Sequence, residues 1–521
     1  MMRRTLAGLA LGAAMAFGAG ALPAAAQEGG LLRARLNSDI RSTDPGTNRD
    51  NNTDVVMLHI VEGLVAFREN MAVGPLLAES MTVSEDGKTY RFTLREGVTF
   101  HNGAPLTAQE VVWTWRRLME PATGWRCLPD FDGRGVTKLL SVEAADARTV
   151  VFTFDRPSAL IPANMARPDC AGAGILHPDS VGPDGRWRAP IGTGPFRLGE
   201  WRREQYVELT RFDRYAALPG RPDGLTGNKT AGVARLRFLI VPDGSAAKAG
   251  LLAGNLDNVP DLATSELPEL RARPDIGIDI HDTLGLNAIL IQTRDQILRD
   301  VRVRQALALA IDFEPLVESV SNDTSRANMS MVPMGSSYRT GPLTQGWTRD
   351  LNRARALLRE AGYRGQTLRM ATTRRYMSIF NQSVLVQAMA EEIGVKIELD
   401  VLDWATMIDR FNRGDYQLMS FSYGARLDPS LSYDTIIGNK DDTPRKLWDD
   451  PQAIADLQAS MTETDPARRG AIFARLHARM LEQVPIIPLY NASIVGGSRR
   501  NVRGYQGWPA ELPRYWGVTV N

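Results

Sequence analysis

Apolar and polar residues alternate in short runs along the chain, and these runs predict strands and helices in turn. In Thr149–Phe154 the second, fourth and sixth residues are apolar, which predicts a strand with one buried face, and Tyr90–Leu94 alternates in the same way. Thr107 followed by Glu110 has the form of a capping box, so we expect a helix that begins there and continues through Met119. The first half of the chain therefore contains both kinds of element.

The second half contains well-marked helix boundaries. Asp350 is placed to cap a helix that ends at Gly362, because an aspartate accepts from the free N–H groups of a first turn and a glycine commonly ends the last one. Asp465 followed by Pro466 predicts the start of another helix, in which apolar residues recur at helical spacing. Both helices are expected to bury one face.

Strands follow helices here as well. A helix at Val384–Ile393 is expected to stop at Gly394 and to lead into a strand at Lys396–Val401. The segment Leu218–Gly232 is rich in proline and glycine and is expected to be a surface loop. Helices that alternate with short strands in both halves indicate an α/β protein.

The N-terminus has the form of a secretory signal peptide. Arg3 and Arg4 precede an apolar core, Leu6–Leu22, and Ala24–Ala26 form a small-residue cleavage site before Gln27. No cysteine lies near this site, so attachment of a lipid at the new N-terminus is not expected. We expect residues 1–26 to be removed and the remaining chain to be a soluble protein of the periplasm.

Composition narrows the class further. Removal of 26 of the 521 residues leaves 495, which suggests about three domains. The same removal leaves 59 basic and 60 acidic residues, a balance that gives no indication of binding to nucleic acid or to an anionic membrane. No later segment has the run of about 18 apolar residues that crossing a bilayer requires. Any partner in the membrane is expected to be a separate chain.

The chain has only two cysteines, Cys127 and Cys170. In an oxidising compartment such a pair is expected to form a disulfide, which would stabilise the fold by roughly 4 kcal/mol through the constraint it places on the unfolded chain. Two buried thiols that never meet are the alternative, because sequence alone does not give the distance between the two residues.

Four segments, taken in their order along the chain, carry a resemblance to a known family. The turn Ile191–Phe196 (I-G-T-G-P-F) lies between an upstream pair, Leu76–Ser80 and Ser84–Lys88, and a downstream segment, Val301–Ala306. This set resembles the family 5 solute-binding proteins of ABC importers, the group of oligopeptide, dipeptide and nickel receptors. The resemblance runs from about residue 37 to the C-terminus.

The resemblance implies a two-lobe, hinged architecture of the cluster C type, with an extra subdomain inserted in the first lobe. The hinge crossings are expected near Asp282–Leu286 and Ile487–Asn491. The implied parts are the lobe I core at 27–60, 190–283 and 488–521, the inserted subdomain at 61–189 and lobe II at 284–487.

The resemblance also implies where cargo is held. In peptide receptors of this family a carboxylate four residues before a proline grips the ammonium group of the peptide. Counted back from Pro429, that position is Ala425. Counted forward from Trp404, a second reference point of the family, the same position is Arg426, because the two counts differ by one residue. The expected negative charge is missing either way. A buried ammonium without an anionic partner costs several kcal/mol, whereas an arginine binds a carboxylate or phosphate through two parallel hydrogen bonds.

At a second position the chain also lacks the acidic residue that the peptide receptors of the family carry. Arg49 falls where the peptide receptors carry an acidic group near the ligand, and Asn51 is adjacent. Arg49 and Arg426 from opposite lobes are therefore candidates to clamp one anion. The alternative is that each is solvated or paired internally, because arginine accounts for 54 of the 61 basic residues and a single arginine is weakly informative.

Aromatic residues complete the candidate ligand-binding set. Trp404 lies where the family often places an indole against its ligand, and packing on the following helix is the alternative. Tyr423 and Trp125 are weaker candidates, and His59 and Asn491 are weaker still.

Other classes of function have less support. The chain contains no G-x-S-x-G, H-E-x-x-H or P-loop motif, and its five histidines are scattered, so neither an enzyme nor a protein with its own metal site or cofactor is expected. A periplasmic chaperone or signalling subunit would need exposed apolar surface instead of a closing cleft. We expect a monomeric periplasmic receptor that delivers an organic anion or a modified peptide to ABC permease subunits. Ordinary di- or oligopeptides, or an anionic metal chelate, are the alternative cargoes.

Overall fold

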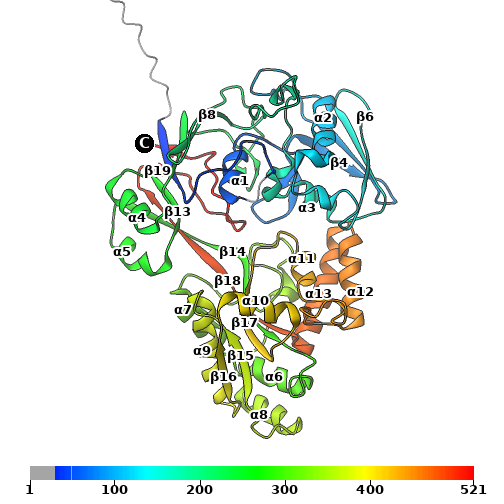
Figure 1. Ribbon diagram of the computed structural model, residues 1–521, viewed down its shortest axis with the longest axis vertical. Coiled ribbons are helices and arrows are strands. Elements are labelled where there is room, and N and C mark those ends of the chain that lie inside the picture. The colour runs from blue at the N-terminus through cyan, green and yellow to red at the C-terminus, as the bar shows by residue number, and fades with distance from the viewer. Residues whose placement is uncertain (1–29, 48–49) are drawn as a thin grey trace, which may run out of the picture.

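The computed structural model describes residues 30–47 and 50–521, which form two lobes that share one ten-stranded sheet (Figure 1). From one edge to the other its strands are β16 (Ile397–Val401), β15 (Leu368–Thr372), β17 (Leu418–Tyr423), β14 (Ile276–Ile291), β18 (Ile486–Arg499), β13 (Asn258–Leu262), β1 (Leu31–Leu36), β12 (Arg235–Ile240), β9 (Tyr206–Arg211) and β8 (Phe196–Arg202). The signal-peptide prediction concerns residues 1–26, which lie outside the described residues.

The first lobe carries a second, four-stranded sheet beside the large one. Its strands are, in order, β4 (Ala78–Val83), β5 (Thr89–Leu94), β7 (Thr149–Phe154) and β6 (Leu139–Ala144). Shorter pairs are β2 (Val65–Phe67) with β3 (Val73–Pro75), β10 (Pro222–Asp223) with β11 (Thr226–Gly227), and β19 (Val502–Arg503) with β20 (Thr519–Val520). The helices of this lobe are α1 (Asn51–Met57), α2 (Ala108–Met119), α3 (Ile161–Met165), α4 (Gly244–Ala253) and α5 (Leu267–Arg271).

The second lobe is richer in helix. Its helices are α6 (Val301–Ala310), α7 (Phe313–Ser321), α8 (Leu351–Glu360), α9 (Met377–Glu391), α10 (Trp404–Arg413), α11 (Pro429–Asp434), α12 (Pro451–Thr462) and α13 (Pro466–Gln483). Alternate residues of β14 divide between two hydrophobic clusters: Ile289 and Ile291 belong to one, Ala288 and Leu290 to the other. Since successive strand residues point to opposite faces, helices cover both faces of the sheet here.

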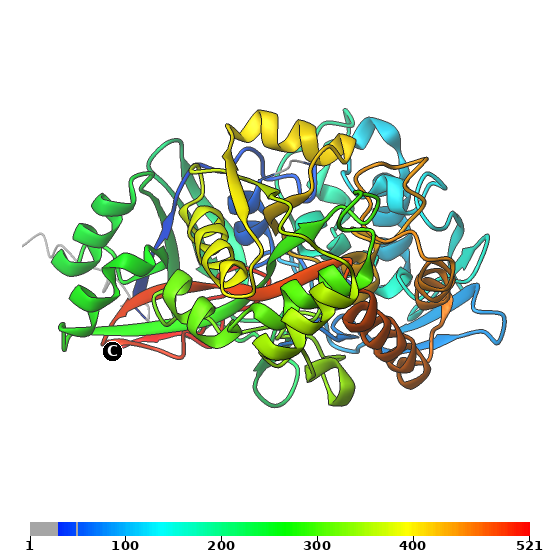
Figure 2. The ribbon, with the colours of Figure 1, turned by 90° about the horizontal axis from the view of Figure 1, so that it is seen from below.

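Two long antiparallel strands, β14 and β18, pass from one lobe to the other side by side (Figures 1 and 2). Their pairing is irregular between Asp282 and Leu286. Leu284 packs in the hydrophobic cluster of the first lobe and Leu286 in a cluster of the second, so the core divides at this point. The fold is the two-lobe α/β architecture that the sequence predicts.

Most elements expected from the sequence are present. The capping box at Thr107 and the helix through Met119 are confirmed by α2, and Asp350 caps α8 by accepting from the Arg353 N–H. The helix before Gly394 begins at Met377, seven residues before the expected Val384. The first turns of this helix bury polar side chains; Gln382, for example, donates to Ser420. The helical spacing of apolar residues is therefore interrupted there, and the sequence pattern does not show where the helix begins.

The segment Leu218–Gly232 is more than a surface loop. It forms β10 and β11, and Lys229 is buried with its Nζ 3.2 Å from a carboxylate oxygen of Glu62. The same carboxylate accepts from Thr193 and Tyr215, so one buried charge has three donors. A buried carboxylate is tolerated only with such partners, which fixes this segment against the core.

The G-T-G-P-F turn owes its glycines to this packing. A Cβ on Gly192 would overlap the carbonyl oxygen of Ile60, and one on Gly194 would lie 2.6 Å from the carbonyl oxygen of His59. The Thr193 hydroxyl between them donates to Glu62 over 3.0 Å. The turn is therefore a close approach of two backbone segments and part of the scaffold.

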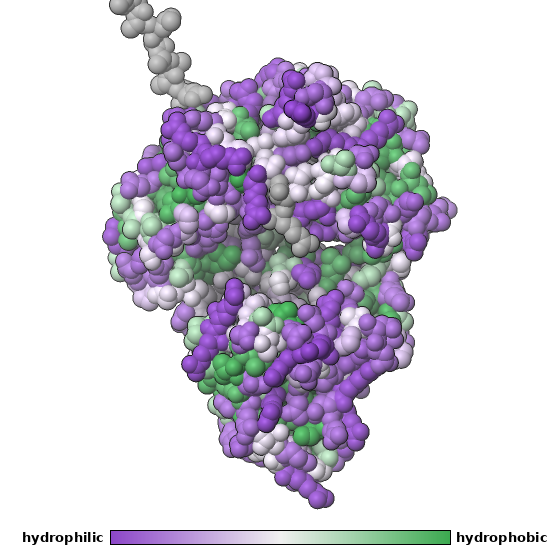
Figure 3. Space-filling model, in the orientation of Figure 1, coloured by the Kyte–Doolittle hydropathy of each residue, from purple (hydrophilic) through white to green (hydrophobic). Residues whose placement is uncertain are grey.

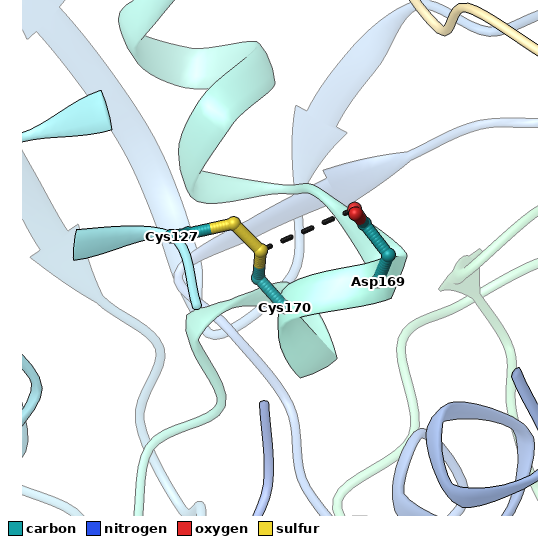
Figure 4. A group of neighbouring side chains, drawn as sticks. All are labelled: Cys127, Asp169 and Cys170. Carbon is teal, nitrogen blue, oxygen red and sulfur yellow. Dashed lines mark hydrogen bonds between the residues drawn. A yellow bond between two sulfur atoms is a disulfide. The ribbon is translucent and has the colours of Figure 1, made fainter. Parts of the chain in front are cut away.

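A disulfide joins Cys127 to Cys170, whose Cα atoms are 6.0 Å apart (Figure 4). The dashed line in Figure 4 joins Cys170 Sγ to the Asp169 carboxylate 4.0 Å away; a bonded sulfur has no proton to donate, so this contact is packing. The bond holds the segment that contains Asp169 in place.

Candidate functional site

A cavity of about 460 Å³ lies between the two lobes, in the hollow visible in Figure 3; we call it the charged cavity. From the first lobe it is lined by Asn51, Phe67, Arg167, Asp169 and Leu512, among others. From the second lobe it is lined by Ala425, Arg426, Asp428, Leu431, Asp434 and Arg445, among others. Its size is that of a typical small-molecule site.

The second-lobe wall is the loop that follows β17. Strands β15, β16 and β17 are parallel, so their carboxyl ends meet at one edge, and the loop from Gly424 to Asp428 leaves from that edge. Asp428 ends the loop by capping α11, accepting from the Ser430 N–H over 2.8 Å. Cap and strand thus fix both ends of the loop.

The first-lobe wall includes the start of α1. Asp50 caps this helix by accepting from the Thr53 N–H over 3.0 Å, which places Asn51 at its first position. Asn51 is exposed to the cavity, and its side-chain amide is 3.5 Å from the carbonyl oxygen of Glu511. A helix start and the C-terminal segment therefore meet at this wall.

Each carboxylate of the charged cavity has a basic partner. Asp169 accepts two hydrogen bonds from Arg167, at 3.0 and 2.7 Å, and Asp434 lies 3.4 Å from Lys446. Burial raises the pKa of Asp169, but its Arg167 hydrogen bonds and the nearby arginine charges outweigh this and hold the pKa below its usual value. These acids are already compensated.

Asp428 is the most tightly held of the three. It is buried, and Arg469 donates to both of its oxygens, at 2.8 and 2.6 Å. The guanidinium also donates to Ser430 and to the carbonyl of Ser460, so the pair satisfies itself. It presents no free charge to the cavity.

Two arginines of the second-lobe wall, unlike the carboxylates of the cavity, have no partner of opposite charge among the described residues. Within residues 30–47 and 50–521, neither Arg426 nor Arg445 has an acidic group within ion-pair distance; Arg426 donates only to the carbonyls of Gly424 and Ala425. Both charges act on the buried phenol of Tyr423: burial raises its pKa strongly, and Arg445 and Arg426 oppose this. The second-lobe wall therefore carries two uncompensated positive charges.

The structure brings three of the sequence candidates together and separates the others. Asn51, Ala425 and Arg426 line the charged cavity. Arg49 lies outside the described residues. Tyr423 is buried at the end of β17, and its hydroxyl has no hydrogen-bond partner among the described residues.

Trp404 and Trp125 both stack on other aromatic rings. Trp404 is half-buried at the start of α10, parallel to Phe421 with ring centres 6.1 Å apart. Trp125 is buried and stacks on Phe131 with ring centres 5.5 Å apart. Neither lines the charged cavity.

The two weakest candidates serve the scaffold. His59 is buried, with Nδ1 2.7 Å from the carbonyl of Val55. Asn491 is buried in the first half of β18, opposite Leu286 of β14, and accepts from Asn328 over 2.8 Å.

Sequence reasoning missed Arg445 and Arg167. Arg445 lies in the irregular segment between α11 and α12, seventeen residues beyond Asp428, and no motif surrounds it. Only the tertiary fold shows that Arg445 shares a wall with Arg426 and that Arg167 is already paired, because in a chain so rich in arginine the residue type alone carries little information.

Among the described residues one group has the spacing of a metal site, namely Cys127, Asp169 and Cys170. Both sulfurs are used in the disulfide, so no thiolate remains to ligate a metal. No helix in the described part of the chain is long and apolar enough to cross a bilayer.

Comparison with known proteins gives consistent matches over nearly the whole chain. The family model of the bacterial extracellular solute-binding proteins, family 5, matches residues 72–443. The dipeptide-binding protein of Escherichia coli K12 is 25% identical over 502 residues, covering 91% of each chain. Di/tripeptide-binding protein 4 of Pseudomonas aeruginosa is 28% identical over 480 residues, covering 85% of this chain and 86% of that one. The solved structure of HbpA2 from Haemophilus parasuis has a TM-score of 0.80 at 24% identity and covers 94% of this chain and 100% of that one.

Proposed function

This chain belongs to the bacterial extracellular solute-binding proteins of family 5, and we propose that it captures an organic anion in the charged cavity and delivers it to an ABC permease. Members of the family are receptors of ABC importers, mostly for peptides, and they work with permease subunits in the membrane. The relatives matched are binding proteins, and the role of this chain is that of a receptor.

One observation carries the choice of cargo: Arg426 and Arg445 lack acidic partners among the described residues, while Asp169, Asp428 and Asp434 all have basic ones. A site that desolvates two free guanidiniums on closing needs a negative charge from its ligand. Because a guanidinium holds a carboxylate or phosphate through two parallel hydrogen bonds, an anion of this kind is the chemistry that fits.

Two of the relatives compared above are a dipeptide-binding and a di/tripeptide-binding protein, so an ordinary di- or tripeptide is the second candidate. Its carboxylate would suit the arginines, but its ammonium would need an acid. The position where the family's peptide receptors carry that acid is Ala425 here, and the nearby carboxylates are already paired. A modified peptide without a free ammonium avoids this cost.

We propose that binding works by closure of the lobes about β14 and β18. The core divides between Leu284 and Leu286, and the pairing of these strands is irregular there, which supports hinge crossings near Asp282–Leu286 and Ile487–Asn491. A ligand that contacts both walls stabilises only the closed form, so its binding shifts the population toward closure.

We also propose that the protein acts in the periplasm after removal of residues 1–26. The family's proteins work outside the cytoplasmic membrane, and the apolar core ahead of Gln27 supports export. Intact-mass measurement of the periplasmic protein is expected to give a chain that begins at Gln27.

The test of the cargo is a thermal-shift panel of simple di- and tripeptides beside carboxylates, sugar phosphates and N-blocked peptides. We expect stabilisation by anions that lack an ammonium group. Arg426→Asp is expected to weaken the best ligand by about 10- to 100-fold, the value of a charge-assisted hydrogen bond.

The control is Arg364→Asp, which makes the same charge change at an exposed position just beyond α8, at the far end of the second lobe (Figure 1). It is expected to leave affinity unchanged. Strong stabilisation by plain dipeptides with none by anions, or full affinity in Arg426→Asp, would contradict the proposal.

A further inference from the structure

A second cavity lies between the lobes, of about 760 Å³; we call it the apolar chamber. Phe67, Ala163 and Asp428 line both it and the charged cavity, so the two spaces adjoin. The first lobe contributes Met71, Val73 and Met81 to the chamber, and the second contributes Leu343 and one face of α13. In Figure 3 hydrophobic residues border the gap between the lobes.

The chamber differs from the charged cavity in its chemistry. Of the described residues that line it, only Asp428 and Arg469 are charged, and they neutralise each other in a buried bidentate pair. The remaining lining is mostly apolar or small. A charged group entering the chamber would lose water without gaining a partner, whereas an apolar group would gain about 25 cal/mol for each Å² buried.

Helix α13 makes room for such a group. It faces the chamber with Ala467, Gly470, Ala471 and Ala474, spaced so that they share one helix face. Ala467 and Ala471 are exposed to the open space. Larger side chains at these positions would fill the chamber.

The chamber is bounded by direct contacts between the lobes. The Ala159 N–H donates to the carbonyl of Met461 over 2.9 Å, and the Ser337 N–H donates to the carbonyl of Asn70 over 2.8 Å. Ala159 and Ser337 both line the chamber. Its walls are therefore held together by backbone hydrogen bonds from both sides of the gap.

We infer that the cargo is an amphipathic anion, with its acidic group at Arg426 and Arg445 and an apolar portion that passes Phe67 into the apolar chamber. The inference rests on the proposed function, because the charged cavity supplies the anchor for the acidic group. It adds the substrate class: an acid that carries an extended acyl, alkyl or aromatic portion.

The test is isothermal titration of the mature protein with N-acetylglycine, N-hexanoylglycine and N-decanoylglycine, which share one carboxylate, have no ammonium and differ only in their apolar portion. Affinity is expected to rise about three- to fourfold for each methylene that enters the chamber. Between the acetyl and hexanoyl compounds this amounts to a gain on the order of 100-fold.

Ala471→Trp, with Ala467→Trp as a second variant, is expected to abolish most of this gain while N-acetylglycine binds within about twofold of wild type. Ala455→Trp places the same side chain at an exposed position of α12 outside the chamber and is expected to leave the whole series unchanged.

The outcomes separate the two claims. Affinity that does not depend on chain length, yet falls in Arg426→Asp, overturns the chamber and leaves the anion site standing. Chain-length dependence that survives Arg426→Asp without loss overturns the anion site. Absence of binding by all three compounds overturns the amphipathic assignment.

Discussion

At the scale of single residues, the buried His59 is part of the packed interior of the first lobe. His59 is enclosed by aromatic rings, among them Phe196 and Trp516, and both of its ring nitrogens are used. The Tyr515 N–H donates to Nε2 over 3.1 Å, which leaves the proton on Nδ1 for the carbonyl of Val55. Protonation of Nε2 would break the first of these bonds.

Burial lowers the pKa of His59 to about 3, with the nearby charge of Lys229 acting in the same direction and the Val55 bond opposing it. Since the folded-state pKa lies below the value near 6.5 of an unfolded chain, the unfolded state takes up this proton first as pH falls. The free energy of unfolding contributed by His59 therefore decreases below about pH 6.5, by up to about 1.4 kcal/mol per pH unit.

Denaturant unfolding at several pH values between 7 and 5 is expected to show a shallower pH dependence in His59→Gln than in wild type, by up to one proton. Because other buried groups titrate in both proteins, only the difference between the two slopes is informative. Equal slopes would contradict this, because they would mean that His59 takes up its proton equally in the folded and unfolded states.

At the scale of elements, close backbone approach explains the family turn. Gly192→Ala would drive a methyl group into the carbonyl of Ile60 and is expected to lower the free energy of unfolding by about 3 kcal/mol. Gly244→Ala, at the first position of α4 with open space around it, is expected to be neutral or slightly stabilising. Thermal unfolding of the two variants compares them directly, and equal melting temperatures would contradict this role of the turn.

Some helices and strands could be predicted from the sequence, and others could not. Capping and alternation predict α2, β5 and β7 because their signals are local. The start of α9 is missed because buried Gln382 pairs with Ser420 on a distant strand, and the burial of Lys229 is missed because its partner is far away in sequence. Each miss depends on a tertiary contact that no local pattern records.

The residues of the candidate site also fall into those that the sequence predicts and those that only the fold shows. Asn51, Ala425 and Arg426 follow from the family resemblance and line one cavity. Arg445 is brought beside Arg426 only by the folding of the second lobe, and the apolar chamber forms only where both lobes meet. Trp125 shows the converse: an aromatic residue proposed for the ligand stacks on Phe131 inside the first lobe.

At the scale of the whole molecule, capture of the ligand requires that the two lobes move as rigid bodies about β14 and β18. Small-angle scattering is expected to show a smaller radius of gyration with the most stabilising anion of the panel, because closure brings the walls of the charged cavity together. Arg426→Asp at the same ligand concentration is expected to keep the larger value. An unchanged radius in ligand-saturated wild type would contradict closure.

The central claim is that the cargo is an anion held at Arg426. Native mass spectrometry of the protein taken from the periplasm, followed by denaturation and identification of the released compound, tests it most directly. We expect a retained small molecule with an acidic group and an apolar portion, which is lost from Arg426→Asp and kept by Arg364→Asp. Recovery of unmodified di- or tripeptides in equal amounts from wild type and Arg426→Asp would contradict it.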